Sequence, residues 1–198
     1  RWQEGDWDRA LQKYDDVKKL APNYVQVHHQ TGNVYTKLGD AAMNQARSLM
    51  DAGDQSEAQK KRQKAAEYYN LALESYNKYW KLDPVFPQNF YRMAWVYMQL
   101  GDSSKAEEMY RAALVHNPDY AETHLNLGNI LYLQNKLDEA EAAYLRAIEL
   151  NPRFVQAMKN LSVVYDKTGR KKEAEDLWKE IARINPNDED LKRVFKQN

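Results

Sequence analysis

The spacing of four prolines constrains this chain more than any other feature of its sequence. They stand 34 residues apart without drift, and each follows an Asp or Asn at the end of an amphipathic run. Their positions are Pro84, Pro118, Pro152 and Pro186. A fixed period of this length is typical of repeat proteins made of stacked helical hairpins, in which each hairpin buries its apolar side against its neighbours. The sequence therefore predicts an all-α protein.

Other residues recur in register with the prolines, and each recurrence has a physical reason. Small residues let two helices approach closely, large rings fill the space that remains, and glycine accepts the left-handed backbone that ends a helix. The small residues are Ala94, Gly128 and Ser162 on the first helices and Ala106, Ala140 and Ala174 on the second. The rings are Tyr110, Tyr144 and Trp178, and the turns hold Gly101, Asn135 and Gly169, with Asn135 in the place of glycine.

This pattern resembles the tetratricopeptide repeat, and Ala121 to Pro152 is close to the family consensus. The resemblance implies a right-handed α-solenoid of stacked hairpins that forms a single domain over residues 1–198. Within it we expect the second half of a truncated repeat at 1–22, a repeat with an insertion at 23–84, regular repeats at 85–118, 119–152 and 153–186, and a cap or the start of another repeat at 187–198. The partner helix of 1–22 is expected upstream of Arg1, and Leu191, Val194 and Phe195 are expected on one stripe of the last segment.

The second repeat is longer than the others. Pro22 and Pro84 are 62 residues apart, which is 28 more than the period, with the insertion near residues 41–68. Lengthening both helices by 14 residues, about four turns, keeps the same side facing inward. We therefore predict a helix from about Val25 to Asp51, a tip at 52–55 and a returning helix to about Leu82. The rival interpretation ends the first helix at Gly39 and places a short helix at 41–50, because glycine weakens a helix interior.

Composition limits the function. The chain has no Cys, so disulfides and thiolate metal sites are excluded, and its 29 basic and 29 acidic residues argue against a nucleic-acid-binding protein. No apolar run is long enough to insert into a membrane. We find no catalytic constellation, and we expect no cofactor and no metal. The cytoplasm is the default compartment, and an extracytoplasmic location stays open.

The resemblance implies a protein or peptide partner on the concave face, which the first helix of each hairpin lines. The candidate contacts there are His29, Asn33, Tyr91, Arg92, Trp95, Met98, Asn126, Asn129, Tyr132 and Asn160. Asparagine amides suit the backbone of an extended peptide. Most other inner positions, Leu133 and Val163 among them, hold ordinary surface residue types.

Two groups of these candidates have two interpretations each. Tyr91 and Trp95, beside Arg92, have the composition of an interaction hot spot, and they also suit packing under the long hairpin. The basic cluster Lys60, Lys61, Arg62 and Lys64 near the hairpin tip suits an anionic partner, but a solvated helix face is the simpler interpretation.

One recognition mode of the family is improbable here. Some members hold the carboxylate of a chaperone tail with Lys, Arg and Asn side chains, but Glu122 at one of the corresponding positions would repel a carboxylate. Three function classes remain: a scaffold that binds a peptide or partner segment, an appendage that recruits partners or substrate for a larger bacterial glycan polymerase, ligase or glycosyltransferase, and a structural module with weak self-association through the repeat ends.

Overall fold

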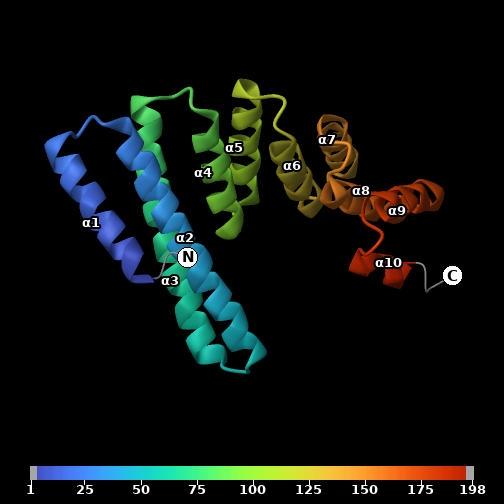
Figure 1. Ribbon diagram of the computed structural model, residues 1–198, viewed down its shortest axis with the longest axis horizontal. Helices are drawn as coiled ribbons and strands as arrows, with labels where there is room; N and C mark the ends of the chain where they lie inside the picture. The colour runs from blue at the N-terminus through green and yellow to red at the C-terminus, as the bar shows by residue number, and fades with distance from the viewer. Residues whose placement is uncertain (1–3, 195–198) are drawn as a thin grey trace. The chain divides into compact units, whose positions relative to one another are not determined.

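A computed structural model describes residues 4–194 of the chain, with side chains from residue 6 on. Within these residues every regular element is a helix, and the predicted all-α class is confirmed (Figure 1). The chain divides into two compact units, Arg1–Met109 and Tyr110–Asn198. The boundary lies inside helix α5 (Ser103–His116).

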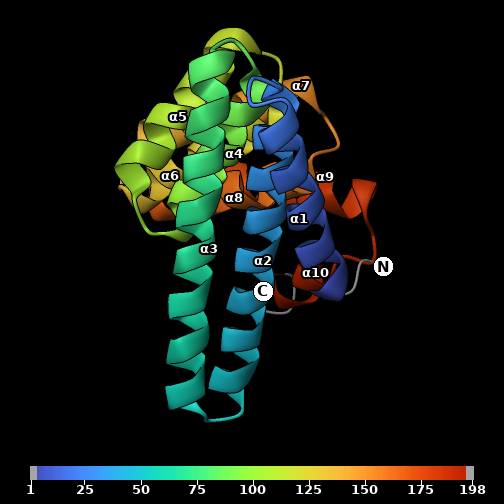
Figure 2. The ribbon, with the colours of Figure 1, turned by 90° about the vertical axis from the view of Figure 1, so that its left-hand side faces the viewer.

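Unit 1 is built around a long antiparallel hairpin. It contains α1 (Glu4–Leu20), α2 (Val25–Asp51), α3 (Gln55–Leu82), α4 (Pro87–Gln99) and the start of α5. Figures 1 and 2 show α2 and α3 side by side along their whole length, with their connecting loop beyond the ends of α1 and α4. The predicted bounds of this hairpin are confirmed, and the rival interpretation with a helix end at Gly39 is wrong because α2 runs through that residue.

The insertion lengthens the two helices of the hairpin equally. α2 has 27 residues where α4 has 13, and α3 has 28 residues where the later second helices have 14. Each helix thus gains two heptads, and residues seven positions apart face the partner helix at successive levels. Ala58, Ala65 and Ala72 are fully buried along α3, and Ala42 and Ala46 are buried along α2.

Three glycines bring helices within contact distance of a tyrosine ring. A Cβ atom built on Gly32 or Gly39 of α2 would lie 2.5 Å from the ring of Tyr76 or Tyr69, respectively. The same atom on Gly128 would lie 2.6 Å from the ring of Tyr144. Because all three rings are almost completely buried, any larger residue at these glycines would displace them. We call this arrangement the glycine–tyrosine contact. It occurs twice in the long hairpin.

Four turns adopt the left-handed backbone that the repeat pattern predicts. The backbone φ angle is +85° at Gly53, +81° at Gly101 and +80° at Gly169. Asn135 occupies the corresponding turn with φ of 60°, as expected for a residue that tolerates this region better than most. After two of these glycines an Asp side chain caps the next helix: Asp54 accepts from the Glu57 backbone N–H, and Asp102 accepts from that of Lys105.

Unit 2 contains shorter helices of regular length. After the end of α5 come α6 (Ala121–Leu133), α7 (Leu137–Leu150), α8 (Val155–Lys167), α9 (Lys171–Ile184) and α10 (Glu189–Val194). Met158, Trp178, Ile181 and Leu191 form its last core cluster, so α10 packs on α8 and α9. Lys159 of α8 forms ion pairs with Asp188 at 2.6 Å and with Asp190 at 2.7 Å. Val194 packs against the cluster as expected, and Phe195 lies outside the described residues.

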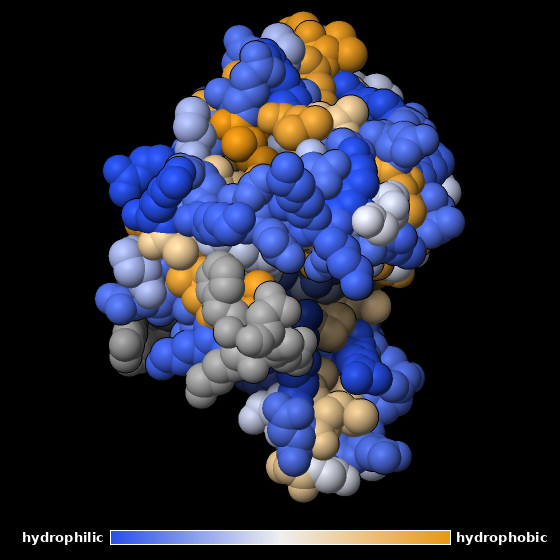
Figure 3. Space-filling model, turned by 90° about the vertical axis from the view of Figure 1, so that its right-hand side faces the viewer, coloured by the Kyte–Doolittle hydropathy of each residue, from blue (hydrophilic) through white to orange (hydrophobic). Residues whose placement is uncertain are grey.

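The face of the molecule drawn in Figure 3 is mainly polar. Hydrophilic residues cover most of it, and hydrophobic residues form small separate groups. The mean hydropathy of −0.89 agrees with this picture. Local pockets are therefore better candidates for selective binding than a broad apolar surface.

Candidate peptide-binding pocket

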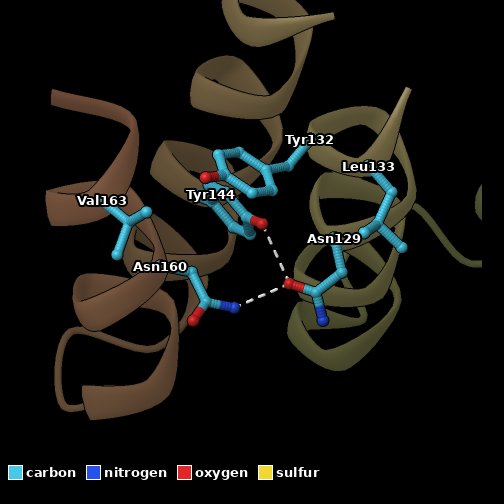
Figure 4. A pocket seen from close by; sticks show the side chains of 6 residues that line it. All are labelled: Asn129, Tyr132, Leu133, Tyr144, Asn160 and Val163. Carbon is cyan, nitrogen blue, oxygen red and sulfur yellow. Dashed lines mark hydrogen bonds between the residues drawn. The ribbon is translucent and has the colours of Figure 1, made fainter. Parts of the chain in front are cut away.

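A pocket of about 250 Å³ opens between α6 and α8 of unit 2. Asn129, Tyr132 and Leu133 come from α6, Tyr144 from α7, and Asn160 and Val163 from α8 (Figure 4). We call it the amide pocket. Its exposed wall is mainly apolar, and two of its lining residues carry side-chain amides. It gathers three of the predicted contacts, Asn129, Tyr132 and Asn160.

The amide of Asn129 is fixed by two hydrogen bonds to its oxygen. The Tyr144 hydroxyl donates to Asn129 Oδ1 at 2.9 Å, and Asn160 Nδ2 donates to the same atom at 2.6 Å. Burial raises the pKa of Tyr144, so its hydroxyl keeps the proton that it donates. Asn160 is held in turn because its Oδ1 accepts from Gln156 Nε2 at 2.8 Å.

The nitrogen of Asn129 remains available for a further contact. Figure 4 shows Nδ2 directed away from Tyr144 and Asn160. Within residues 6–194, Asn129 Nδ2 has no hydrogen-bond partner. An amide whose oxygen is saturated and whose N–H groups have no partner can donate to a backbone carbonyl of a bound chain.

The rim of the amide pocket is apolar and exposed, with one cation close by. Leu133 is 69% exposed and Val163 is 46% exposed. Lys167 places its Nζ atom 4.9 Å from the centre of the Tyr132 ring and donates to Asn135 Oδ1 at 2.9 Å. An apolar side chain inserted between Leu133 and Val163 would remove both from water.

Sequence reasoning passed over Leu133 and Val163. Both stand at inner positions of the repeat, but a single Leu or Val on a helix surface is common and carries little information. The spacing of Asn129 and Val163 on helices of successive hairpins was the available signal. Among the other contacts predicted in this unit, Asn126 is half-buried and does not line the amide pocket.

The predicted contacts of unit 1 are more dispersed. His29 is only 7% exposed, and the rings of Tyr76, Tyr79 and Phe86 surround it. The prediction that His29 faces a partner is therefore corrected: its position in the hairpin places the imidazole in an aromatic cluster. Asn33 is half-buried and accepts from the Tyr76 hydroxyl at 2.9 Å, as Asn129 does from Tyr144.

The α4 candidates differ in exposure. Arg92 is exposed, whereas Tyr91, Trp95 and Met98 are half-buried. Trp95 packs against the core cluster of the long hairpin, which supports the packing interpretation, and it also lines a pocket with Asp40 and Arg47. The role of Trp95 as an interaction hot spot stays a prediction.

The basic cluster at the hairpin tip is partly neutralised. Lys60 pairs with Glu57 at 2.6 Å and Lys64 pairs with Glu67 at 2.8 Å, one turn away in each case. Arg62 is exposed and Lys61 is half-buried. Exposed pairs of this kind contribute little to stability, and they halve the positive charge that an anionic partner would meet.

Among residues 6–194, no group of His, Asp or Glu side chains is arranged to hold a metal ion. No helix in the same range has the length and apolar character needed to cross a membrane.

Comparison with known proteins places this geometry in context. A family model described as tetratricopeptide repeat matches residues 91–152 and 134–189. A curated relative, tetratricopeptide repeat protein 8 of Caenorhabditis elegans, is 32% identical over 78 residues. That alignment covers 38% of this chain and 15% of the relative, so the chain spans a small part of its length.

Two solved structures share the fold along most of the chain. The crystal structure of MamA is similar with a TM-score of 0.72 and 23% identity, covering 92% of this chain and 91% of that one. YrrB, described as a TPR protein with an unusual peptide-binding site, is similar with a TM-score of 0.70 and 20% identity, covering 98% and 85%. At these identities the likeness establishes the fold.

Proposed function

The chain belongs to the tetratricopeptide-repeat family, and on that premise we propose that it holds an extended peptide segment of a partner protein over α6 and α8, with one apolar side chain of that peptide in the amide pocket. Proteins of this fold are typically non-catalytic scaffolds for protein interactions. The free Nδ2 donor of Asn129, fixed in direction by Tyr144 and Asn160, is the observation that carries the proposal.

The two parts of the pocket have different roles in this interaction. Asn129 Nδ2 donates to a backbone carbonyl, which every residue type provides, so this contact sets the position of the peptide and not its sequence. Selectivity comes from the rim, where an aliphatic side chain such as Leu or Met fits between Leu133 and Val163. Lys167 near the rim favours an acidic residue next to that side chain.

The binding free energy that the amide pocket alone can supply is small. Burying a Leu-sized side chain contributes about 1.5–3 kcal/mol, and a net hydrogen bond about 0.5–1.5 kcal/mol. Their sum corresponds to a dissociation constant of roughly 1 mM or weaker. A physiological partner must therefore gain affinity from further contacts outside the amide pocket.

A selection from a random linear peptide library displayed on phage, with the whole chain as bait, tests the proposal. The affinity of synthetic copies of the selected peptides is measured by fluorescence polarisation. Val163→Glu places a charge on the apolar rim and is expected to weaken binding by about tenfold or more. Asn129→Asp keeps the acceptor for Tyr144 and Asn160 but removes the donor, and is expected to weaken it by about 2–10-fold.

Leu145→Glu is the matched control, because Leu145 is 45% exposed on α7 and does not line the amide pocket. Circular dichroism of each variant checks that the helices remain. The proposal fails if selected peptides bind Val163→Glu and Leu145→Glu with equal affinity. It also fails if the aliphatic residue of the selected peptides can be replaced by Ala without loss.

A further inference from the structure

The inserted heptads create a second pocket that regular hairpins lack the length to form. It also measures about 250 Å³ and lies within unit 1, between α2, α3 and α4. Asp40, Met43, Asn44 and Arg47 of α2 line it together with Tyr69 of α3 and Trp95 and Gln99 of α4. We call it the charged pocket. More of its wall is polar than in the amide pocket.

The charged pocket repeats the architecture of the amide pocket with a changed polar group. In both pockets a glycine lies against a tyrosine ring, and the residue after the glycine accepts the tyrosine hydroxyl: Tyr144 donates to Asn129 at 2.9 Å and Tyr69 donates to Asp40 at 2.8 Å. Asp40 thus takes the position of Asn129. Its acidic side chain replaces a neutral amide.

The second acceptor bond of Asn129 has no counterpart at Asp40. Asn129 Oδ1 also accepts from Asn160, whereas within residues 6–194 the only hydrogen-bond donor to the Asp40 carboxylate is Tyr69. Gln99 lines the charged pocket but makes no hydrogen bond to Asp40. The half-buried Asp40 therefore lines the charged pocket with acceptor capacity to spare on its carboxylate.

A cation without a partner stands across the same pocket. Arg47 is exposed, and it forms no ion pair or hydrogen bond with any residue in the range 6–194. Asp40 and Arg47 are seven residues apart on α2, so two turns, about 10 Å, separate them along the helix axis. The half-buried Trp95 and Met43 give this pair an apolar wall.

We propose that the charged pocket binds a peptide segment that carries a basic and an acidic side chain two residues apart. The Lys or Arg of the ligand pairs with Asp40 beside the Trp95 ring, and its Asp or Glu pairs with Arg47. A ligand with one charge would be attracted by one of these groups and repelled by the other. In an extended peptide, residues two apart project to the same side about 7 Å from each other, and long side chains span the remaining distance.

This inference concerns a different pocket and a different ligand chemistry from the proposed function. Either can fail without the other. The probe is the acetylated and amidated tripeptide Lys-Ala-Glu, together with Glu-Ala-Lys, Lys-Ala-Ala and Ala-Ala-Glu. The readout is the indole N–H resonance of Trp95 in a proton–nitrogen correlation spectrum of the whole chain, which has five tryptophans. Trp95→Phe assigns that resonance.

One of the two doubly charged tripeptides is expected to shift the Trp95 resonance with a dissociation constant of roughly 1–20 mM, the range for contacts worth about 2–4 kcal/mol. Asp40→Asn and Arg47→Gln are each expected to weaken it at least about threefold, and added salt should weaken it further. Val163→Glu, in the amide pocket, should leave it unchanged. The proposal is overturned if no tripeptide shifts Trp95 up to about 20 mM, or if a singly charged tripeptide binds as tightly as both doubly charged ones.

Discussion

The long hairpin α2–α3 and the regular hairpin α6–α7 use the same packing arrangement a different number of times. α6–α7 has one glycine–tyrosine contact, Gly128 with Tyr144, whereas α2–α3 has two, Gly32 with Tyr76 and Gly39 with Tyr69. The two contacts in the long hairpin are one heptad apart. Insertion of whole heptads therefore extended a helical hairpin while keeping the same side buried.

The long hairpin lacks one hydrogen bond that the regular hairpin has. Near Tyr144 the next hairpin supplies Asn160, which completes the bonds of Asn129. Near Tyr69 the neighbouring helix α4 ends at Gln99, and the equivalent acceptor, Asp40, keeps a single donor. Extending a hairpin past its neighbours copies the apolar core but leaves polar groups at its edge without partners. Such edges are places where new binding sites can arise.

The largest expected loss of stability comes from removing the tyrosine ring of a glycine–tyrosine contact. Tyr144→Ala and Tyr69→Ala each delete a buried ring, which typically costs about 3–5 kcal/mol. We expect Tyr144→Ala to lower protection from hydrogen exchange throughout α6 and α7. Tyr69→Ala should lower it mainly in residues 40–68, because the Gly32–Tyr76 contact still holds the base of the long hairpin.

Hydrogen exchange followed by mass spectrometry distinguishes these outcomes, with the exposed Leu145→Ala as the control. Equal loss of protection along the whole of α2 and α3 in Tyr69→Ala would show that the two contacts act as one cooperative unit.

A smaller effect is expected at the two Gly-Asp pairs of the long hairpin. Gly39→Ala places a Cβ against the Tyr69 ring and should destabilise unit 1 by about 1–3 kcal/mol, although alanine favours a helix interior. In the Tyr69→Ala background the clash is gone, so the same change should become neutral or stabilise by up to about 1 kcal/mol.

Urea unfolding of the four variants in this cycle measures the coupling between the two residues. Gly53→Ala, at a turn with open space around it, serves as the control for backbone strain and should cost about 1–2 kcal/mol in both backgrounds. A Gly39→Ala cost that persists without the Tyr69 ring would contradict the proposed contact.

The smallest expected effect is a dependence of stability on pH through His29. Burial is the main cause that lowers the pKa of His29 below its ordinary value of 6.5, and Arg92 nearby also lowers it. The contribution of His29 to the free energy of unfolding is therefore fully present above about pH 6.5. It is lost as the pH falls further, because the unfolded chain binds a proton more readily than the folded chain does. The slope is at most about 1.4 kcal/mol per pH unit.

The regular hairpin supplies the control substitution for this pH effect. Leu125 of α6 stands at the position equivalent to His29 and is buried, so His29→Leu copies the regular hairpin. Thermal unfolding from about pH 7.5 to about pH 5.5 should lower the midpoint more in the wild type than in His29→Leu. Parallel curves would mean that His29 does not take part in the acid response.

Much of the fold could be predicted from sequence because repeat proteins have mostly local contacts. The period placed the helices, and Asn135 was correctly expected at a left-handed turn. The pockets could not be predicted, because they depend on how residues from three helices meet. His29 illustrates the limit: its repeat position suggested an inner surface, but Tyr79 and Phe86, at the junction of two repeats, enclose it.

The two Gly-Asp pairs of the long hairpin separate what sequence and structure each determined. At Gly53-Asp54 the glycine turns the chain and the Asp caps the next helix, as the local sequence dictates. Gly39-Asp40 is the same dipeptide, yet the helix continues through it. There the glycine admits the Tyr69 ring and the Asp accepts the Tyr69 hydroxyl. The sequence alone determined the repeat and the length of the insertion, because both follow from local periodicity. Only the tertiary structure decided between turn and helix at Gly39, because the deciding partner lies 30 residues away.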